Sequence, residues 1–179
     1  MTATLRPARP GDAPAIARIY VAGWQDAYPG LLPDRLLVGM RRGEGRAERW
    51  ARTIRYPGRG ERVMVAEAGD GAVIGFAGGG PARSRGFAYD SEVYTLYVDG
   101  DHQEGGVGRR LFCALAVELA SALGPSLIVW VLAGNPARYF YEALGGRHVG
   151  RRSGSLGGAA IEELAYGWPD AAVLAASQG

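Results

Sequence analysis

The N-terminal third of the chain alternates short polar breaks with apolar positions spaced for helices. Residues 5–8 form a short strand candidate. Asp12 followed by Pro14 then predicts a helix start, because an acidic cap satisfies free backbone N–H groups and proline is harmless in the first turn. Two further helices are expected, over residues 33–40 and 46–56.

The middle of the chain carries the alternation and turn signals of strands. Gly69-Asp70-Gly71 separates the apolar runs 63–68 and 73–77, and an Asp-Gly pair in that position predicts a hairpin, because its tight turn needs positive φ. Gly78-Gly79-Gly80-Pro81 is expected to close this two-stranded ribbon. The next strand spans 91–98, and strict alternation places Glu92, Tyr94, Leu96 and Val98 on one face and Val93, Thr95 and Tyr97 on the other.

The C-terminal half begins with a helix and a buried strand. The helix is predicted from Val107 to the stop at Gly124-Pro125. The continuous apolar run 127–132 then predicts a strand that is covered on both faces. Asn135 is fit to cap the following helix, which is expected to end at Gly145.

The last segments predict a hairpin and a tail. Two strands, 147–152 and 161–166, are expected to pair across the glycine-rich residues 153–158. The order of elements along the chain predicts one mixed α/β domain over 1–168, followed by a short C-terminal tail over 169–179.

Composition is that of an ordinary globular protein. The 179 residues are 47% hydrophobic and 21% charged, which suffices for one well-filled domain. The 20 basic and 18 acidic residues give a net charge of +2 without a basic run, which argues against nucleic-acid binding. The longest apolar run, Leu127 to Ala133, is far shorter than the ~20 residues of a membrane span, so we expect a cytoplasmic protein. Cys113 lies mid-helix and is expected in the core, and one cysteine with two histidines does not make a metal site.

A glycine-rich loop links the strand 91–98 to the helix that begins at Val107. Gly106 and Gly108 lack the Cβ atoms that would keep an anion from the backbone amides, and the helix dipole adds about half a positive charge there. The loop is not a dinucleotide fingerprint, because Leu111 stands where a third glycine belongs, and no Gly-Lys-Ser/Thr of a P-loop follows. It predicts an anion site, with an ordinary connector as the alternative.

This loop and the segments around it resemble the GNAT superfamily of acetyl-CoA-dependent N-acetyltransferases. The family loop, Gln/Arg-x-x-Gly-x-Gly/Ala, is matched by Gln103, Gly106 and Gly108. The family segment Asn-x-x-Ala-x-x-Phe-Tyr-Glu-x-x-Gly-Phe is similar to the stretch that contains Asn135, Ala137, Phe140, Tyr141, Glu142 and Gly145. The run from Trp24 to Pro33 and the Glu48-Arg49-Trp50 triplet also look like one bacterial branch of the family, so the resemblance covers nearly the whole chain.

The resemblance implies a fold and a cosubstrate. The fold is a twisted, mostly antiparallel sheet of six to seven strands, splayed between the fourth and fifth strands and flanked by about four helices. Acetyl-CoA would lie in the splay, with its pantetheine arm along the fourth strand and its pyrophosphate on the amides of the loop. The cofactor-binding residues implied in this way are Leu96, Tyr97, Val98, Gln103, Glu104, Gly105, Gly106, Val107, Gly108, Arg109, Asn135 and Tyr141.

Catalytic roles follow from the same resemblance. The N–H of Leu96 would polarise the thioester carbonyl, and the phenol of Tyr141 would protonate the leaving thiolate; the alternative for Tyr141 is a packed helix aromatic. Asn135 and Tyr141 are six residues apart where the family usually has seven, and Gly146 stands where the family has Phe.

The attacking amine must first lose a proton, because a free amine has a pKa near 10. Glu92 is the candidate base, and the alternative is a salt bridge with Arg83 or Arg85. Residues that are expected to line the acceptor pocket, with simple packing as the alternative, are Trp24, Tyr28, Asp90 and Tyr94.

These observations together predict an N-acetyltransferase that moves an acetyl group from acetyl-CoA to a primary amine by direct attack in a ternary complex. The alternative is a non-catalytic acyl-CoA-binding module, which the short spacing before Tyr141 favours. A nucleotide-binding domain of another kind is disfavoured by the missing motifs. Small-molecule and peptide amines both stay open as acceptors, as do a monomer and a homodimer.

Overall fold

One seven-stranded sheet organises the protein, in the order β1-β2-β3-β4-β5-β7-β6. The computed structural model describes residues 3–41, 45–83 and 86–175. The strands are β1 (Thr4–Pro7), β2 (Arg62–Glu67), β3 (Val73–Pro81), β4 (Ser91–Val98), β5 (Leu127–Leu132), β6 (Arg147–Leu156) and β7 (Ala159–Trp168). The helices are α1 (Ala13–Ala27), α2 (Asp34–Arg41), α3 (Arg46–Arg55), α4 (Val107–Leu123), α5 (Ala137–Ala143) and α6 (Ala172–Ala175), with short 3-10 turns η1 (Pro10–Asp12) and η2 (Gly100–Gly105). The mixed α/β prediction is confirmed, with more helices than the four expected.

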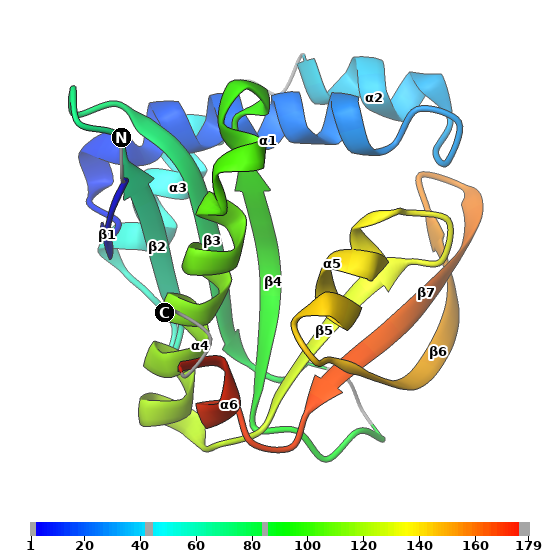
Figure 1. Ribbon diagram of the computed structural model, residues 1–179. Coiled ribbons are helices and arrows are strands. Elements are labelled where there is room, and N and C mark those ends of the chain that lie inside the picture. The colour runs from blue at the N-terminus through cyan, green and yellow to red at the C-terminus, as the bar shows by residue number, and fades with distance from the viewer. Residues whose placement is uncertain (1–2, 42–44, 84–85, 176–179) are drawn as a thin grey trace.

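The sheet divides where its two parallel strands diverge. β4 pairs with β5 in parallel, and the pairing runs only from Ser91 with Leu127 to Val93 with Val129. Every other neighbouring pair of strands is antiparallel. Beyond Val93 the halves β1–β4 and β5–β7–β6 splay apart, as the ribbon shows (Figure 1). The predicted splay between the fourth and fifth strands is therefore confirmed.

Helices cover both faces of the β1–β4 half. Figure 1 shows α4 on one face of these strands and α3 on the other. The α4 side is the larger core, built around Leu111, Phe112 and Leu115, and Cys113 lies fully buried in it as predicted. Ile16 of α1 belongs to a second buried cluster on the other face. Within the described part of the chain, no helix has the length and apolar character needed to cross a membrane.

β3 continues through its three glycines and ends at Pro81, so the strand predicted over 73–77 is four residues too short. These glycines permit close packing and do not form a turn. A Cβ on Gly79 would lie 2.6 Å from the carbonyl oxygen of Glu92, and one on Gly80 would lie 2.9 Å from the hydroxyl of Tyr94. Local sequence does not reveal such a contact, because the neighbouring atoms come from another strand.

A β-bulge in β4 overturns the predicted alternation. Gly78 pairs with Thr95 and the next residue, Gly79, pairs with Val93, so Tyr94 is an extra residue on β4. As a result Val93 faces the same core as Leu96 and Val98. Side chains before the bulge, including Glu92, are thus on the opposite face from the one that strict alternation assigns to them.

The β6–β7 hairpin is longer than predicted. Residues 153–158 were expected to be a glycine-rich connector, but β6 extends to Leu156 and β7 begins at Ala159. Only Gly157 and Gly158 form the turn, and both have positive φ. The turn is held against α2, because Arg35 donates a hydrogen bond to the carbonyl of Gly157 at 3.1 Å.

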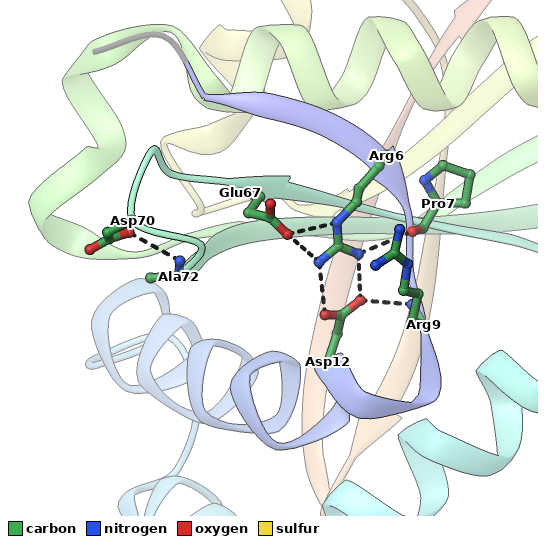
Figure 2. Close-up of polar contacts among 7 residues, drawn as sticks. All are labelled: Arg6, Pro7, Arg9, Asp12, Glu67, Asp70 and Ala72. Carbon is green, nitrogen blue, oxygen red and sulfur yellow. Dashed lines mark hydrogen bonds and ion pairs between the residues drawn. The ribbon is translucent and has the colours of Figure 1, made fainter.

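An ion-pair network joins the start of the chain to the sheet (Figure 2). The Arg6 guanidinium of β1 donates to the Glu67 carboxylate of β2 and, at 2.7 Å and 3.0 Å, to both carboxylate oxygens of Asp12. Asp12 also accepts the backbone N–H of Arg9 at 2.7 Å. Asp12 lies at the predicted helix start, but its carboxylate accepts hydrogen bonds from the preceding residues Arg6 and Arg9 and does not cap α1. The hydrogen bond from Arg6 holds the pKa of Asp12 below its usual value.

The segment after β7 belongs to the core of the domain. Ala171 and Leu174 are buried, and the backbone N–H of Ala171 donates to the carbonyl of Pro125 at 2.8 Å. The tail predicted from residue 169 therefore begins as a short helix that packs beneath α4.

Candidate active site

The splay between β4 and β5 opens a cleft of about 680 Å³. One wall consists of β4 residues from Val93 to Val98, and the other comes from β5 and β7. α1 contributes its last turns, and α5 contributes Phe140 and Tyr141. A parallel pair that stops after three residues leaves the backbone of β4 beyond Val93 without β5 as a partner, so an extended ligand fits along this edge.

The predicted anion loop lies at the mouth of this cleft. α4 begins at Val107, as predicted, and Gly106 caps it with a φ of 70°. A Cβ on Gly106 would meet no atom within 4 Å, so the loop leaves open space in front of the helix N-terminus. Gln103 and Gly108 line the cleft, and Gln103 donates a hydrogen bond to the carbonyl of Val98 at 3.2 Å. An anion bound here would meet backbone N–H groups and the positive end of a 17-residue helix.

Tyr141 lines the cleft from α5 and is 8% exposed. Its ring contacts Phe112, Phe140 and Trp168, with centroids 5.7 Å, 5.3 Å and 6.5 Å away. Burial raises the pKa of its hydroxyl, so Tyr141 stays protonated at neutral pH. The indole of Trp168 occupies the space beside Gly146, where a Cβ would lie 2.6 Å from it. A side chain at position 146 would therefore collide with this tryptophan.

Asn135 also lines the cleft, although the spacing to Tyr141 is one residue short. It is 6% exposed, and its Oδ1 accepts the N–H of Ala137 at 2.9 Å. The helix starts at Ala137 with Pro136 in the N-cap position, so Asn135, predicted as the cap, lies one residue before it and still binds the first N–H of the helix. The short spacing does not separate Asn135 from Tyr141, because both side chains reach the same cleft.

Three of the four predicted acceptor residues, Trp24, Tyr28 and Tyr94, line the cleft. Burial raises the pKa of Tyr28, and the nearby Glu163 carboxylate adds to this effect. Tyr94 occupies the bulge, and its hydroxyl donates to the carbonyl of Pro81 at 2.7 Å. Asp90 is not among the lining residues. Its carboxylate accepts the backbone N–H and the hydroxyl of Ser126, so we leave it out of the acceptor pocket.

Glu92 is buried, 3% exposed, and bonded to the loop before β4. Its carboxylate accepts the backbone N–H of Arg83 at 2.9 Å and pairs with the Arg83 guanidinium at 2.8 Å. Arg85, the other partner considered, lies outside the described residues. Glu92 does not line the cleft, so its role as a base stays a prediction that this geometry does not favour.

Several cleft residues were missed by sequence reasoning. They are Trp130 of β5, Ile161 and Glu163 of β7, Asp26 of α1 and Thr95 of β4. Ile161 and Glu163 are two residues apart, so alternation in β7 placed them on one face, but nothing local indicates which face meets the cleft. Glu163 is 2.7 Å from the Arg152 guanidinium. The charged residues among those that line the cleft in the described ranges, Asp26 and Glu163, are both acidic.

Two contacts join segments that are distant in the sequence. A Cβ on Gly134, in the turn after β5, would lie 2.6 Å from the side chain of Leu31, which follows α1. Leu36 of α2 contacts Gly157 in the β6–β7 turn in the same way. The two contacts join the segment 31–36 to the turn after β5 and to the β6–β7 turn.

Comparison with known proteins identifies the family of this chain. The sequence profile described as "Acetyltransferase (GNAT) domain" matches residues 59–145. The uncharacterized N-acetyltransferase YuaI of Bacillus subtilis (strain 168) is 32% identical over 171 residues, which is 96% of this chain and 95% of that protein. The chain belongs to the GNAT acetyltransferases. The resemblance predicted from the glycine loop and the α5 segment is thus confirmed.

Solved GNAT structures agree with the fold. The phosphinothricin acetyltransferase of Sinorhizobium meliloti, in complex with AcCoA, superposes with a TM-score of 0.71 at 24% identity, covering 95% of this chain and 89% of that one. The structure of yncA from Salmonella typhimurium, with its cofactor acetyl-CoA, superposes with a TM-score of 0.67 at 26% identity and covers 94% of both chains.

Proposed function

We propose that this GNAT protein transfers the acetyl group of acetyl-CoA to a primary amine, by direct attack within a ternary complex. The observation that carries the proposal is the cleft itself. Its β4 edge, the α4 N-terminus and the Tyr141 side chain converge on one space between the two halves of the sheet.

The residues present fit acetyl-CoA as cosubstrate. When bound, acetyl-CoA supplies a thioester whose carbonyl carbon accepts the amine. The backbone of Leu96 and Val98 would hold the extended pantetheine as an added strand, and the amides of 104–109 would hold the pyrophosphate. The N–H of Leu96 would donate to the thioester oxygen as negative charge develops there. The acetyl-CoA found with two structural relatives supports this choice.

Tyr141 is the proposed general acid. Its hydroxyl makes no hydrogen bond with another described residue, and burial raises its pKa, so the phenol in the cleft is neutral and able to donate a hydrogen bond. A neutral phenol that donates to sulfur lowers the barrier to thiolate departure. The aromatic neighbours Phe112 and Phe140 fix the orientation of the ring.

Glu163 is better placed than Glu92 to take the proton from the amine. It lines the cleft beside Tyr28, whereas the Glu92 carboxylate is occupied by Arg83. The carboxylate of Glu163 accepts the proton directly or through a water molecule, while Arg152 holds the side chain in position.

The test is release of coenzyme A with a panel of small primary amines and peptide N-termini, for wild type, Tyr141→Phe and the control Tyr139→Phe. Tyr139 is 56% exposed on the same helix, so its loss should leave kcat within about twofold. Loss of the acid in Tyr141→Phe should lower kcat by about 10²-fold. Equal rates for the two variants would refute the acid role. Binding of acetyl-CoA with no turnover of any amine would refute catalysis and indicate a binding module.

A further inference from the structure

A second hollow, of about 300 Å³, adjoins the cleft at Tyr94 and Thr95. It lies between α3, the middle of α1 and the strands β2, β3 and β4. Tyr20, Tyr94 and Thr95 line both the hollow and the cleft, so the two spaces share a wall at the β4 bulge. None of the predicted cosubstrate residues borders it.

One face of α3 is turned toward this hollow. Its lining residues Arg46, Arg49, Trp50 and Thr53 recur at steps of three and four along the helix. Arg62 of β2 also borders the hollow, but its guanidinium pairs with Glu118 of α4 at 4.0 Å, and Glu61 is the one acidic residue among the described lining residues. The hollow is thus basic, in contrast to the cleft, where Asp26 and Glu163 supply the charge.

The β3 residues that line the hollow, Gly78 and Gly79, have no side chains, and the neighbouring Thr95 carries a polar group without a partner among the described residues. A Cβ on Gly78 would lie 3.1 Å from the Thr95 hydroxyl and would fill part of the hollow. That hydroxyl is buried and has no hydrogen-bond partner among the described residues. A buried hydroxyl without a partner is costly, so an acceptor oxygen that came within reach of it would be stabilised.

Aromatic side chains bound the same space. The Arg46 guanidinium lies 5.3 Å from the centroid of the Tyr20 ring, and Trp50 contacts Tyr20 edge to face at 6.0 Å. Such contacts hold an arginine side chain in a fixed direction, which reduces the entropy that it loses when an anion binds.

We propose that this hollow binds the carboxylate of the acceptor, so that the preferred substrate is a primary amine that also carries a carboxylate. The inference rests on the proposed acetyl transfer. The amine enters the acidic cleft, and the carboxylate extends past Thr95 toward the arginines of α3. Arginine suits this role because its planar fork matches the two oxygens of a carboxylate.

The experiment compares amines that differ only by the carboxylate. Glycine, β-alanine, γ-aminobutyrate and ε-aminocaproate are each assayed against the n-alkylamine without the acid group, and L-phenylalanine is assayed against phenethylamine. Coenzyme A release gives kcat/KM for each. At least one carboxylated member should exceed its partner by about tenfold or more, since hydrogen bonds to charged groups are the strong ones.

Arg49→Gln and the control Arg52→Gln identify the site. Both arginines are exposed on α3, and Arg52 does not line the hollow. The preference should fall below about threefold in Arg49→Gln, mainly through KM, and persist in Arg52→Gln. Turnover with no preference in wild type, or equal preferences in the two variants, overturns this inference alone. No turnover of any amine overturns the proposed acetyl transfer and this inference with it.

Discussion

Replacement of Gly79 by alanine tests how closely β3 and β4 approach beside the bulge. The added Cβ would lie 2.6 Å from the Glu92 carbonyl oxygen and 2.8 Å from Cδ1 of Leu119. The first neighbour is backbone within a strand ladder and the second is fully buried, so neither moves cheaply. Overpacking of this kind costs about 1–3 kcal/mol, and two such contacts place the cost near about 2–3 kcal/mol.

The size of the effect is measured against a matched control. For a chain of this length, each kcal/mol shifts the Tm by about 2–4 °C, so Gly79→Ala should lower it by roughly 4–12 °C. Gly39→Ala, in α2, meets no atom within 4 Å and should raise the stability by about 0.5–1 kcal/mol through helix preference. Thermal and urea unfolding followed by far-UV circular dichroism measure both changes. Similar unfolding curves for the two variants would refute the reasoning about β3.

Two further predictions concern carboxylates. Asp12→Asn should cost about 2 kcal/mol at neutral pH, because the bonds from Arg6 are lost. Because the folded-state pKa of Asp12 is lowered, the stability difference between wild type and Asp12→Asn is present above the unfolded-state pKa of about 3.9. It disappears as the pH falls through the lower folded-state pKa. A stability difference that does not change with pH in urea unfolding would contradict this prediction. Glu163→Gln should lower kcat/KM by about 10²-fold near neutral pH, and the activity should recover as the pH approaches the pKa of the amine, near 10. Glu92→Gln should instead mainly reduce stability, because the ion pair with Arg83 is lost. Loss of amine turnover in Glu92→Gln, with turnover kept in Glu163→Gln, would instead identify Glu92 as the base.

Features encoded by neighbouring residues were predictable from the sequence. The boundaries of β5 and the start of α4 at Val107 agree with prediction, because a continuous apolar run and a glycine-to-helix transition are local signals. The Asp70 turn is similar, since Asp70 accepts the N–H of Ala72 at 3.0 Å within the turn itself. The GNAT resemblance added the mostly antiparallel sheet and the splay between its fourth and fifth strands.

Features that depend on contacts between distant strands were not predictable. The bulge at Tyr94 exists only in register with β3, and it reverses the face of Glu92. Whether Gly79 forms a turn or a close contact depends on Leu119 and β4, which the local sequence does not show. Glu163 reaches the cleft only because β7 pairs with β5, so sequence reasoning chose Glu92, which strict alternation placed on the same face as Leu96.

The most direct test of acetyl transfer measures both products and the protein in one reaction. The protein, acetyl-CoA and a primary amine that the panel shows to be turned over are mixed, quenched over a time course and analysed by mass spectrometry. The account predicts N-acetylated amine in an amount equal to the coenzyme A released, with the protein mass unchanged at every time point. Acetylated protein that forms first and then decays as amine product appears would contradict direct attack. Release of coenzyme A without acetylated amine would contradict acetyl transfer itself.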